Sequence, residues 1–265
     1  MKRLLIVILL FGIITGYSNM VFAEDVNVTV GLKTWIATWD HKLEFLNEVT
    51  GETEIVSDKS DYGLMYGPVV NFRYEKFFAS LSYLLGGDFN FEWDQLDYSD
   101  PDYGYNLDLD SKDDRTYFDI AIGYYIHPNI SVFLGYKNID IDETATLVEN
   151  VEPFSDADFD GFVDSESSID SSATIKGPAF GVSGNYRIGE SNWILIGSLS
   201  YLSLDGESEG ESLGDFTGPS LEIGGAYVLD TMPLSITAGF KYQSLKADES
   251  EDIFSGLTVG VNYSF

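Results

Sequence analysis

Apolar and polar side chains alternate along most of this chain, with little sign of a helical period. The segment 257–265 shows the pattern clearly, because its odd positions are leucine, valine, tyrosine or phenylalanine and its even positions are small or polar. A period of two predicts a β-strand with one apolar and one polar face. Ten segments of this kind are found, at 26–32, 70–74, 77–85, 118–126, 130–136, 180–186, 193–201, 221–227, 236–242 and 257–265.

The connections between these segments alternate in length. Four are tight turns, at 75–76, 127–129, 189–191 and 230–233. Five are long and polar, at about 41–61, 88–115, 139–171, 204–216 and 246–252. An even number of strands with short turns at one end and long loops at the other predicts an all-β fold, a transmembrane antiparallel up-and-down β-barrel with extracellular loops and periplasmic turns. A soluble β-sandwich has no reason to keep its long loops at one end.

Residues 1–23 have the pattern of a secretory signal peptide. Lys2 and Arg3 precede an apolar stretch from Leu4 to Ile14, and small residues stand at the −3 and −1 positions of a cleavage site after Ala23. This pattern predicts export from the cytoplasm and leaves residues 24–265 as a single barrel domain.

The two faces of the predicted strands differ as they do in membrane barrels. The apolar face ends in tyrosine or tryptophan at many strand termini, as an aromatic girdle requires, and the opposite face carries glycine, serine, asparagine and charge, which predicts a polar lumen. The segment Val259–Phe265 resembles the C-terminal β-signal of bacterial outer-membrane β-barrel proteins. The resemblance implies the Gram-negative outer membrane, contact with its lipid and lipopolysaccharide, and assembly by the barrel-assembly machinery. We expect a monomer.

The charge of the chain is unevenly distributed. The sequence has 44 acidic residues against 14 basic ones, a net charge of −30, and 36 of the acids fall in the five predicted long loops. Such a surface repels phosphate, so nucleic acid is excluded as a partner. The chain has no cysteine, which excludes disulfides and thiolate metal sites.

The inward face is slightly basic. Its predicted charged residues are Lys33, Arg73, Asp119, Lys137, Arg187, Glu222 and Lys241. We expect a packed interior network of charge pairs, and the alternative is a narrow pore with a preference for anions. Trp35 and Trp39 stand at odd positions, whereas the apolar residues of the segment Val26–Leu32 stand at even positions and so face the other side of the strand. Either a bulge near Lys33 turns them outward into the girdle, which we expect, or they face the lumen and form a stacking platform.

One motif in the third long loop suggests a cation site. Residues 156–164 read D-x-D-x-D-G-x-x-D, which resembles the calcium loops of EF-hands, dockerins and thrombospondin type 3 repeats. The resemblance implies Ca²⁺ ligands in loop 156–167 at Asp156, Asp158, Asp160, Phe162 through its carbonyl, Asp164 and Glu166. Ser167 replaces the final glutamate of an EF-hand, and an ordinary solvated acidic loop is the alternative.

An enzyme is not expected. Ten-stranded barrels include the omptin surface proteases, whose site pairs acidic residues with a histidine above the membrane. Of the two histidines, His127 lies in a tight turn, and His41 stands beside Asp40 without the Asp-x-His pattern that this family has in its fourth long loop. The sequence therefore predicts a non-enzymatic outer-membrane barrel that displays acidic loops binding divalent cations. The alternatives are a narrow porin-like channel for small solutes and a surface hydrolase.

Overall fold

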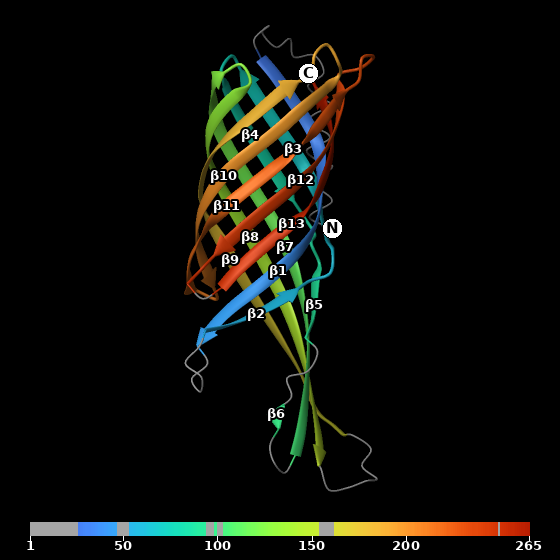
Figure 1. Ribbon diagram of the computed structural model, residues 1–265, viewed down its shortest axis with the longest axis vertical. Helices are drawn as coiled ribbons and strands as arrows, with labels where there is room; N and C mark the ends of the chain where they lie inside the picture. The colour runs from blue at the N-terminus through green and yellow to red at the C-terminus, as the bar shows by residue number, and fades with distance from the viewer. Residues whose placement is uncertain (1–25, 47–52, 94–97, 100–102, 154–161, 249) are drawn as a thin grey trace.

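The computed structural model describes residues 26–46, 53–93, 98–99, 103–153, 162–248 and 250–265, which form β-strands joined by short connections (Figure 1). Ten strands make the barrel wall: β1 (Val26–Leu46), β3 (Gly63–Tyr74), β4 (Phe77–Leu84), β7 (Tyr103–His127), β8 (Ile130–Pro153), β9 (Phe162–Arg187), β10 (Trp193–Ser208), β11 (Glu211–Val228), β12 (Leu234–Lys246) and β13 (Ser250–Ser264). Three short strands lie beside them: β2 (Thr53–Lys59) pairs with β1, while β5 (Phe89–Trp93) and β6 (Tyr98–Ser99) pair with β7.

Each wall strand pairs antiparallel with the next, and β13 pairs with β1 to close the sheet. The prediction of an all-β, antiparallel, ten-stranded barrel is therefore confirmed. In the described residues no helix is long and apolar enough to cross a membrane.

An apolar band covers the outer surface of the barrel. Ile122, Leu134 and Leu257 point outward and are about three-fifths exposed, and their neighbours on the same face are equally apolar. Exposed aromatic side chains border the band toward the tight turns (Tyr74, Phe77, Tyr124, Tyr186, Trp193, Tyr227, Tyr263) and on the opposite side (Tyr66, Tyr136, Phe180, Tyr201, Phe240). Alternation in the sequence arises because every second residue faces this outer surface.

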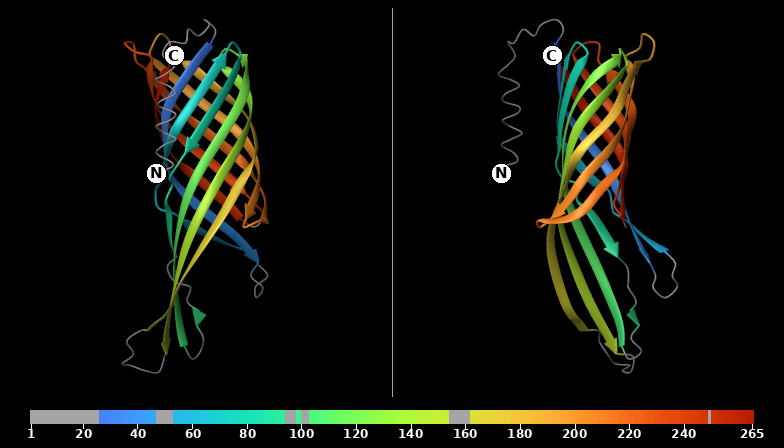
Figure 2. Two further views of the ribbon diagram at one scale, coloured as in Figure 1. Left: turned by 180° about the vertical axis from the view of Figure 1, so that it is seen from behind. Right: turned by 90° about the vertical axis from the view of Figure 1, so that its left-hand side faces the viewer.

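The two ends of the barrel differ. The four tight turns lie together at one end, the upper end in Figure 1, which we call the turn end. At the other, the hairpin end, β7, β8 and β9 continue far beyond the remaining wall strands (Figure 2).

The predicted long loops are wrong as loops over much of their length. β7 and β8 stay paired up to Tyr103 and Pro153, and β8 and β9 up to Val151 and Phe162. Only Glu209 and Gly210 separate β10 from β11. Just beyond the apolar band the outward residues become polar, such as Asp140 and Asp142, while inward residues such as Ile139 stay apolar, so the outward apolar stripe ends although backbone pairing continues.

The interior is not polar throughout. β1 and β13 pair without a register shift from Thr29↔Ser264 to Leu43↔Ser250, so the expected bulge near Lys33 does not exist. Trp35 and Trp39 consequently face the interior and are 0% and 8% exposed. They belong to a buried apolar cluster with Met65, Phe89, Phe91, Tyr117, Ile139, Ile175, Ala179, Leu202, Leu204, Phe216, Leu245 and Phe254. The expectation of a polar lumen is wrong for this half of the barrel.

Candidate functional site in the barrel interior

A polar chamber occupies the interior between the turn end and the apolar cluster. It is a cavity of about 280 Å³, lined by five of the predicted lumen residues: Lys33, Asp119, Lys137, Glu222 and Lys241. Serine hydroxyls from three strands also line it, from Ser80 and Ser82 on β4, Ser198 and Ser200 on β10, and Ser220 on β11.

Two ion pairs line the chamber, one between strands that are not neighbours and one between the adjacent strands β7 and β8. Lys33 Nζ lies 2.7 and 2.8 Å from the two carboxylate oxygens of Glu222, and the Thr258 hydroxyl donates to the same carboxylate at 3.3 Å. Lys137 Nζ lies 2.5 Å from Asp119 Oδ1. These pairs link β1 to β11 and β7 to β8, so they fix the interior of the wall.

Lys241 is the remaining cation of the chamber. It is 7% exposed, and its Nζ lies 4.2 Å from the centroid of the Trp35 ring. Trp35 therefore forms the boundary between the polar chamber and the apolar cluster on its hairpin side.

The other two predicted lumen residues lie outside the chamber. Arg73 is exposed near the turn end, where its guanidinium carbon stands 4.4 Å from the centroid of the Tyr125 ring. Arg187 is exposed as the last residue of β9. Neither takes part in the two ion pairs.

An aromatic layer packs in the interior on the hairpin side of the chamber. It consists of Trp35, Trp39, Phe89, Phe91, Tyr117 and Phe254, all of them buried. The rings meet edge to face in most pairs, with centroid distances of 5.8 Å for Trp35–Tyr117 and 4.7 Å for Trp39–Phe91. Phe89 and Phe91 come from β5, which lies in the segment 88–115 predicted as a loop.

A buried arginine stands within this layer. The Arg115 guanidinium carbon is 3.6 Å from the Trp39 ring centroid and 4.7 Å from that of Phe254. Arg115 is 1% exposed, so these cation–π contacts act in a desolvated environment, where they are strongest.

At the hairpin end of the layer, His41 and Asp252 form a pair that the sequence did not reveal. His41 Nδ1 lies 2.6 Å from Asp252 Oδ1, and the same oxygen accepts a hydrogen bond of 2.8 Å from Trp39 Nε1. The hydrogen bond between His41 and Asp252 raises the pKa of His41 above its usual 6.5. The neighbour considered from the sequence, Asp40, instead accepts a hydrogen bond from Ser57. The partner was missed because it lies on β13, across the closing pair of strands.

Two further acids stand near this pair. Burial raises the pKa of Asp113 from 3.8 to about 6, although Arg115 opposes the shift. Glu143, on β8, accepts hydrogen bonds from Ser111 at 3.2 Å and Ser171 at 3.1 Å. These side chains belong to the inner face of the extended β7–β8–β9 sheet.

The second histidine has a local role. His127 ends β7 at the turn end, and its Nδ1 accepts a hydrogen bond of 3.2 Å from the backbone N–H of Asn129. It is a turn residue, far along the barrel from the His41 pair.

The predicted calcium site lies only partly within the described residues. Asp156, Asp158 and Asp160 fall outside them, while Phe162, Asp164 and Glu166 belong to β9. β9 pairs with β8 there, and the register shifts between Glu149 and Asn150. Among the described residues, no three acidic or histidine side chains form a group that could hold a metal.

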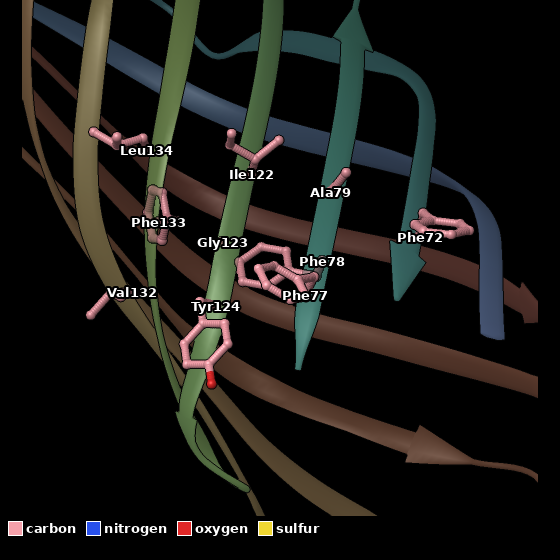
Figure 3. Close-up of a pocket in the computed structure, with 10 residues that line it drawn as sticks. All are labelled: Phe72, Phe77, Phe78, Ala79, Ile122, Gly123, Tyr124, Val132, Phe133 and Leu134. Atoms are coloured by element: carbon pink, nitrogen blue, oxygen red, sulfur yellow. The ribbon is translucent and has the colours of Figure 1, made fainter. Parts of the chain in front are cut away.

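A depression of about 610 Å³ lies on the outer wall over β3, β4, β7 and β8 (Figure 3). Ala79 stands opposite Phe72 on one side and Ile122 on the other, and its small side chain leaves the gap. The lining is apolar apart from the Tyr124 hydroxyl, so this depression offers no group for catalysis or ion binding.

No protein-family model and no curated protein sequence matches the chain. Among solved structures, the outer membrane protease OmpT from Escherichia coli is similar with a TM-score of 0.55 and 14% identity, over 94% of this chain and 99% of that chain. The attachment invasion locus protein Ail of Yersinia pestis has a TM-score of 0.33 and 11% identity, over 89% of this chain and 98% of that chain. The translocator domain of autotransporter NalP from Neisseria meningitidis has a TM-score of 0.33 and 11% identity, over 96% of this chain and 92% of that chain. The protein is thus a closed ten-stranded β-barrel of the bacterial outer-membrane type.

Proposed function

We propose that this protein is a non-enzymatic barrel of the Gram-negative outer membrane, closed to solutes, whose acidic hairpins form an interaction surface outside the cell. The observation that carries the proposal is the filled interior. Trp35, Phe89 and Phe254 are each 0% exposed, and Tyr117 is 1% exposed. A channel needs a continuous path of water, and the aromatic layer interrupts it.

Recording from planar bilayers tests whether the barrel is closed. We expect no steady conductance from the wild-type protein. A triple variant, Trp35→Gly, Trp39→Gly and Phe254→Gly, serves as the positive control because it removes three of the six rings of the layer, and we expect it to conduct. Steady conductance from the wild type at the level of the triple variant would refute the closed barrel and support the narrow channel.

The outward apolar band supports the membrane location. Its aromatic borders suit the two interfaces of a bilayer, and its residues alternate with inward-facing ones as in other membrane barrels. The turn end then faces the periplasm, and residues 1–23 direct export. The hairpin end faces outward, in contact with lipopolysaccharide.

Acidic side chains stand beyond the aromatic border on the hairpin side. Asp140 and Asp142 follow Tyr136 on the outward face of β8, and both are exposed. At ~3.3 Å per residue and ~40° of strand tilt, they lie about 10–15 Å farther along the barrel axis than Tyr136, toward the hairpin end. Asp170 is exposed on the neighbouring strand, opposite Thr144. Anionic headgroups at this height repel these carboxylates, so divalent cations bridge the two, and Ca²⁺ also binds the 156–167 loop.

Limited proteolysis tests the role of the cations. Calcium should slow cleavage in the hairpins and leave the barrel fragment intact, whereas a chelator should speed it. Two variants separate the sites: Asp156→Asn with Asp158→Asn and Asp160→Asn for the loop, and Asp140→Asn with Asp142→Asn for the outer wall. Equal cleavage of the wild type with calcium and with chelator would refute cation binding.

Assays of peptide hydrolysis test the absence of enzymatic activity. We expect none from the folded protein, with His41→Ala and His127→Ala as matched variants. Hydrolysis by the wild type that disappears in His41→Ala and persists in His127→Ala would establish a surface hydrolase instead.

A further inference from the structure

The polar chamber contains one more cation than it has carboxylates. Lys33 pairs with Glu222 and Lys137 pairs with Asp119. Among the residues that the structure describes, no carboxylate lies within ion-pair distance of Lys241. With Lys241 protonated, the charged side chains that line the chamber carry a formal surplus of one positive charge, from Lys33, Lys137 and Lys241 against Asp119 and Glu222.

An unpaired buried charge is costly, because protein and lipid solvate it far less well than water does. The Trp35 ring offsets part of this cost for Lys241 through a cation–π contact at 4.2 Å. The same ring lies between Lys241 and the apolar cluster, so compensation by a counter-ion can come only from within the chamber.

The chamber is rich in groups that donate hydrogen bonds. Five serine hydroxyls line its wall. Trp35 Nε1, in the ring that contacts Lys241, is buried and has no hydrogen-bond partner among the described residues. Lys137 Nζ stands 5.2 Å from the Tyr117 ring centroid. Buried polar groups in native proteins are nearly always satisfied, and most of these can be satisfied by an acceptor.

We infer that the chamber binds a small monovalent inorganic anion beside Lys241, with chloride as the abundant candidate. The anion neutralises the surplus charge and accepts hydrogen bonds from the surrounding donors. The cavity of about 280 Å³ has room for the ion together with several waters. The ion is a structural component of the closed barrel, so the inference concerns stability and makes no claim of transport.

Unfolding in chloride and in gluconate at equal ionic strength tests this inference, because the two salts screen charge equally and differ in the anion that they offer to the chamber. Above the dissociation constant, each tenfold rise in chloride should increase the ratio of folded to unfolded protein about tenfold. Lys241→Met should abolish this dependence. Lys176→Met is the matched control, because Lys176 is an exposed outward-facing lysine that pairs with Glu207 at 3.8 Å, and it should keep the wild-type dependence.

Crystals of the wild-type protein containing bromide provide a second measurement that does not depend on a variant folding. We expect an anomalous peak within the chamber next to Lys241 Nζ. The absence of that peak, or equal chloride dependence in Lys241→Met and the wild type, would overturn the inference.

Discussion

Replacing Trp35 by alanine should be among the most destabilising single changes in this barrel. Trp35 is 0% exposed, and it contacts Tyr117 and Phe254 with ring centroids 5.8 and 6.4 Å away. A buried tryptophan removes about 150–250 Å² of surface from solvent, which corresponds to about 4–6 kcal/mol at ~25 cal/mol per Å². Measured Trp→Ala substitutions in protein cores cost about 3–5 kcal/mol, and we expect a loss in that range for Trp35→Ala.

Urea unfolding in phospholipid vesicles, followed by circular dichroism, measures this loss. Trp193→Ala is the matched control, because Trp193 points outward, is 52% exposed and contacts the ring of Tyr227 with centroids 5.1 Å apart. The control should lose less than half as much free energy of unfolding. Equal losses in the two variants would show that the aromatic layer does not stabilise the barrel as argued.

Three further predictions concern pH and packing. Because Asp252 raises the pKa of His41, the pair stabilises the protein below pH 6.5, and this stabilisation is lost as the pH rises through the pKa of His41 in the folded protein. Asp252→Asn should lower the pKa of His41, and NMR titration of the histidine measures the change. Burial raises the pKa of Asp113 to about 6, so stability falls between pH 3.8 and about 6. Asp113→Asn should remove that fall and stabilise the barrel above pH 6, by up to about 3 kcal/mol in urea unfolding; an unchanged pH profile would contradict the buried position. Gly256→Ala should destabilise the barrel because its Cβ would collide with a carbonyl oxygen of β1, whereas Gly197→Ala meets only ordinary contacts and should be neutral in the same assay.

The outer face of the barrel could be predicted from the sequence because a membrane imposes one requirement on every outward residue. Lipid accepts apolar side chains and rejects charged ones, so the pattern is strict at positions such as Leu257 and Val259. The number of strands, their direction and the tight turns follow from that pattern.

The inner face imposes no uniform requirement. An inward residue needs only a complementary neighbour, so Ser200, which lines the chamber, is followed on the same face of β10 by the buried Leu202 and Leu204. The choice of partner depends on register and on strands far apart in sequence. His41 and Asp252 are separated by 211 positions and meet only because β1 and β13 pair. Alternation within one segment cannot contain that information.

The contact between the first and last strands determines how the barrel can assemble. Until β1 and β13 pair, each has an unpaired edge that could join a neighbouring chain. Side-chain bonds reinforce this contact at both ends, with Thr29 and Ser264 at 3.0 Å near the turns and Trp39 and His41 on Asp252 near the hairpins. Because these bonds join residues 211 to 235 positions apart, we expect them to form late in folding. They should therefore act chiefly by slowing the opening of the closed barrel, and their removal should change the rate of unfolding more than the rate of folding.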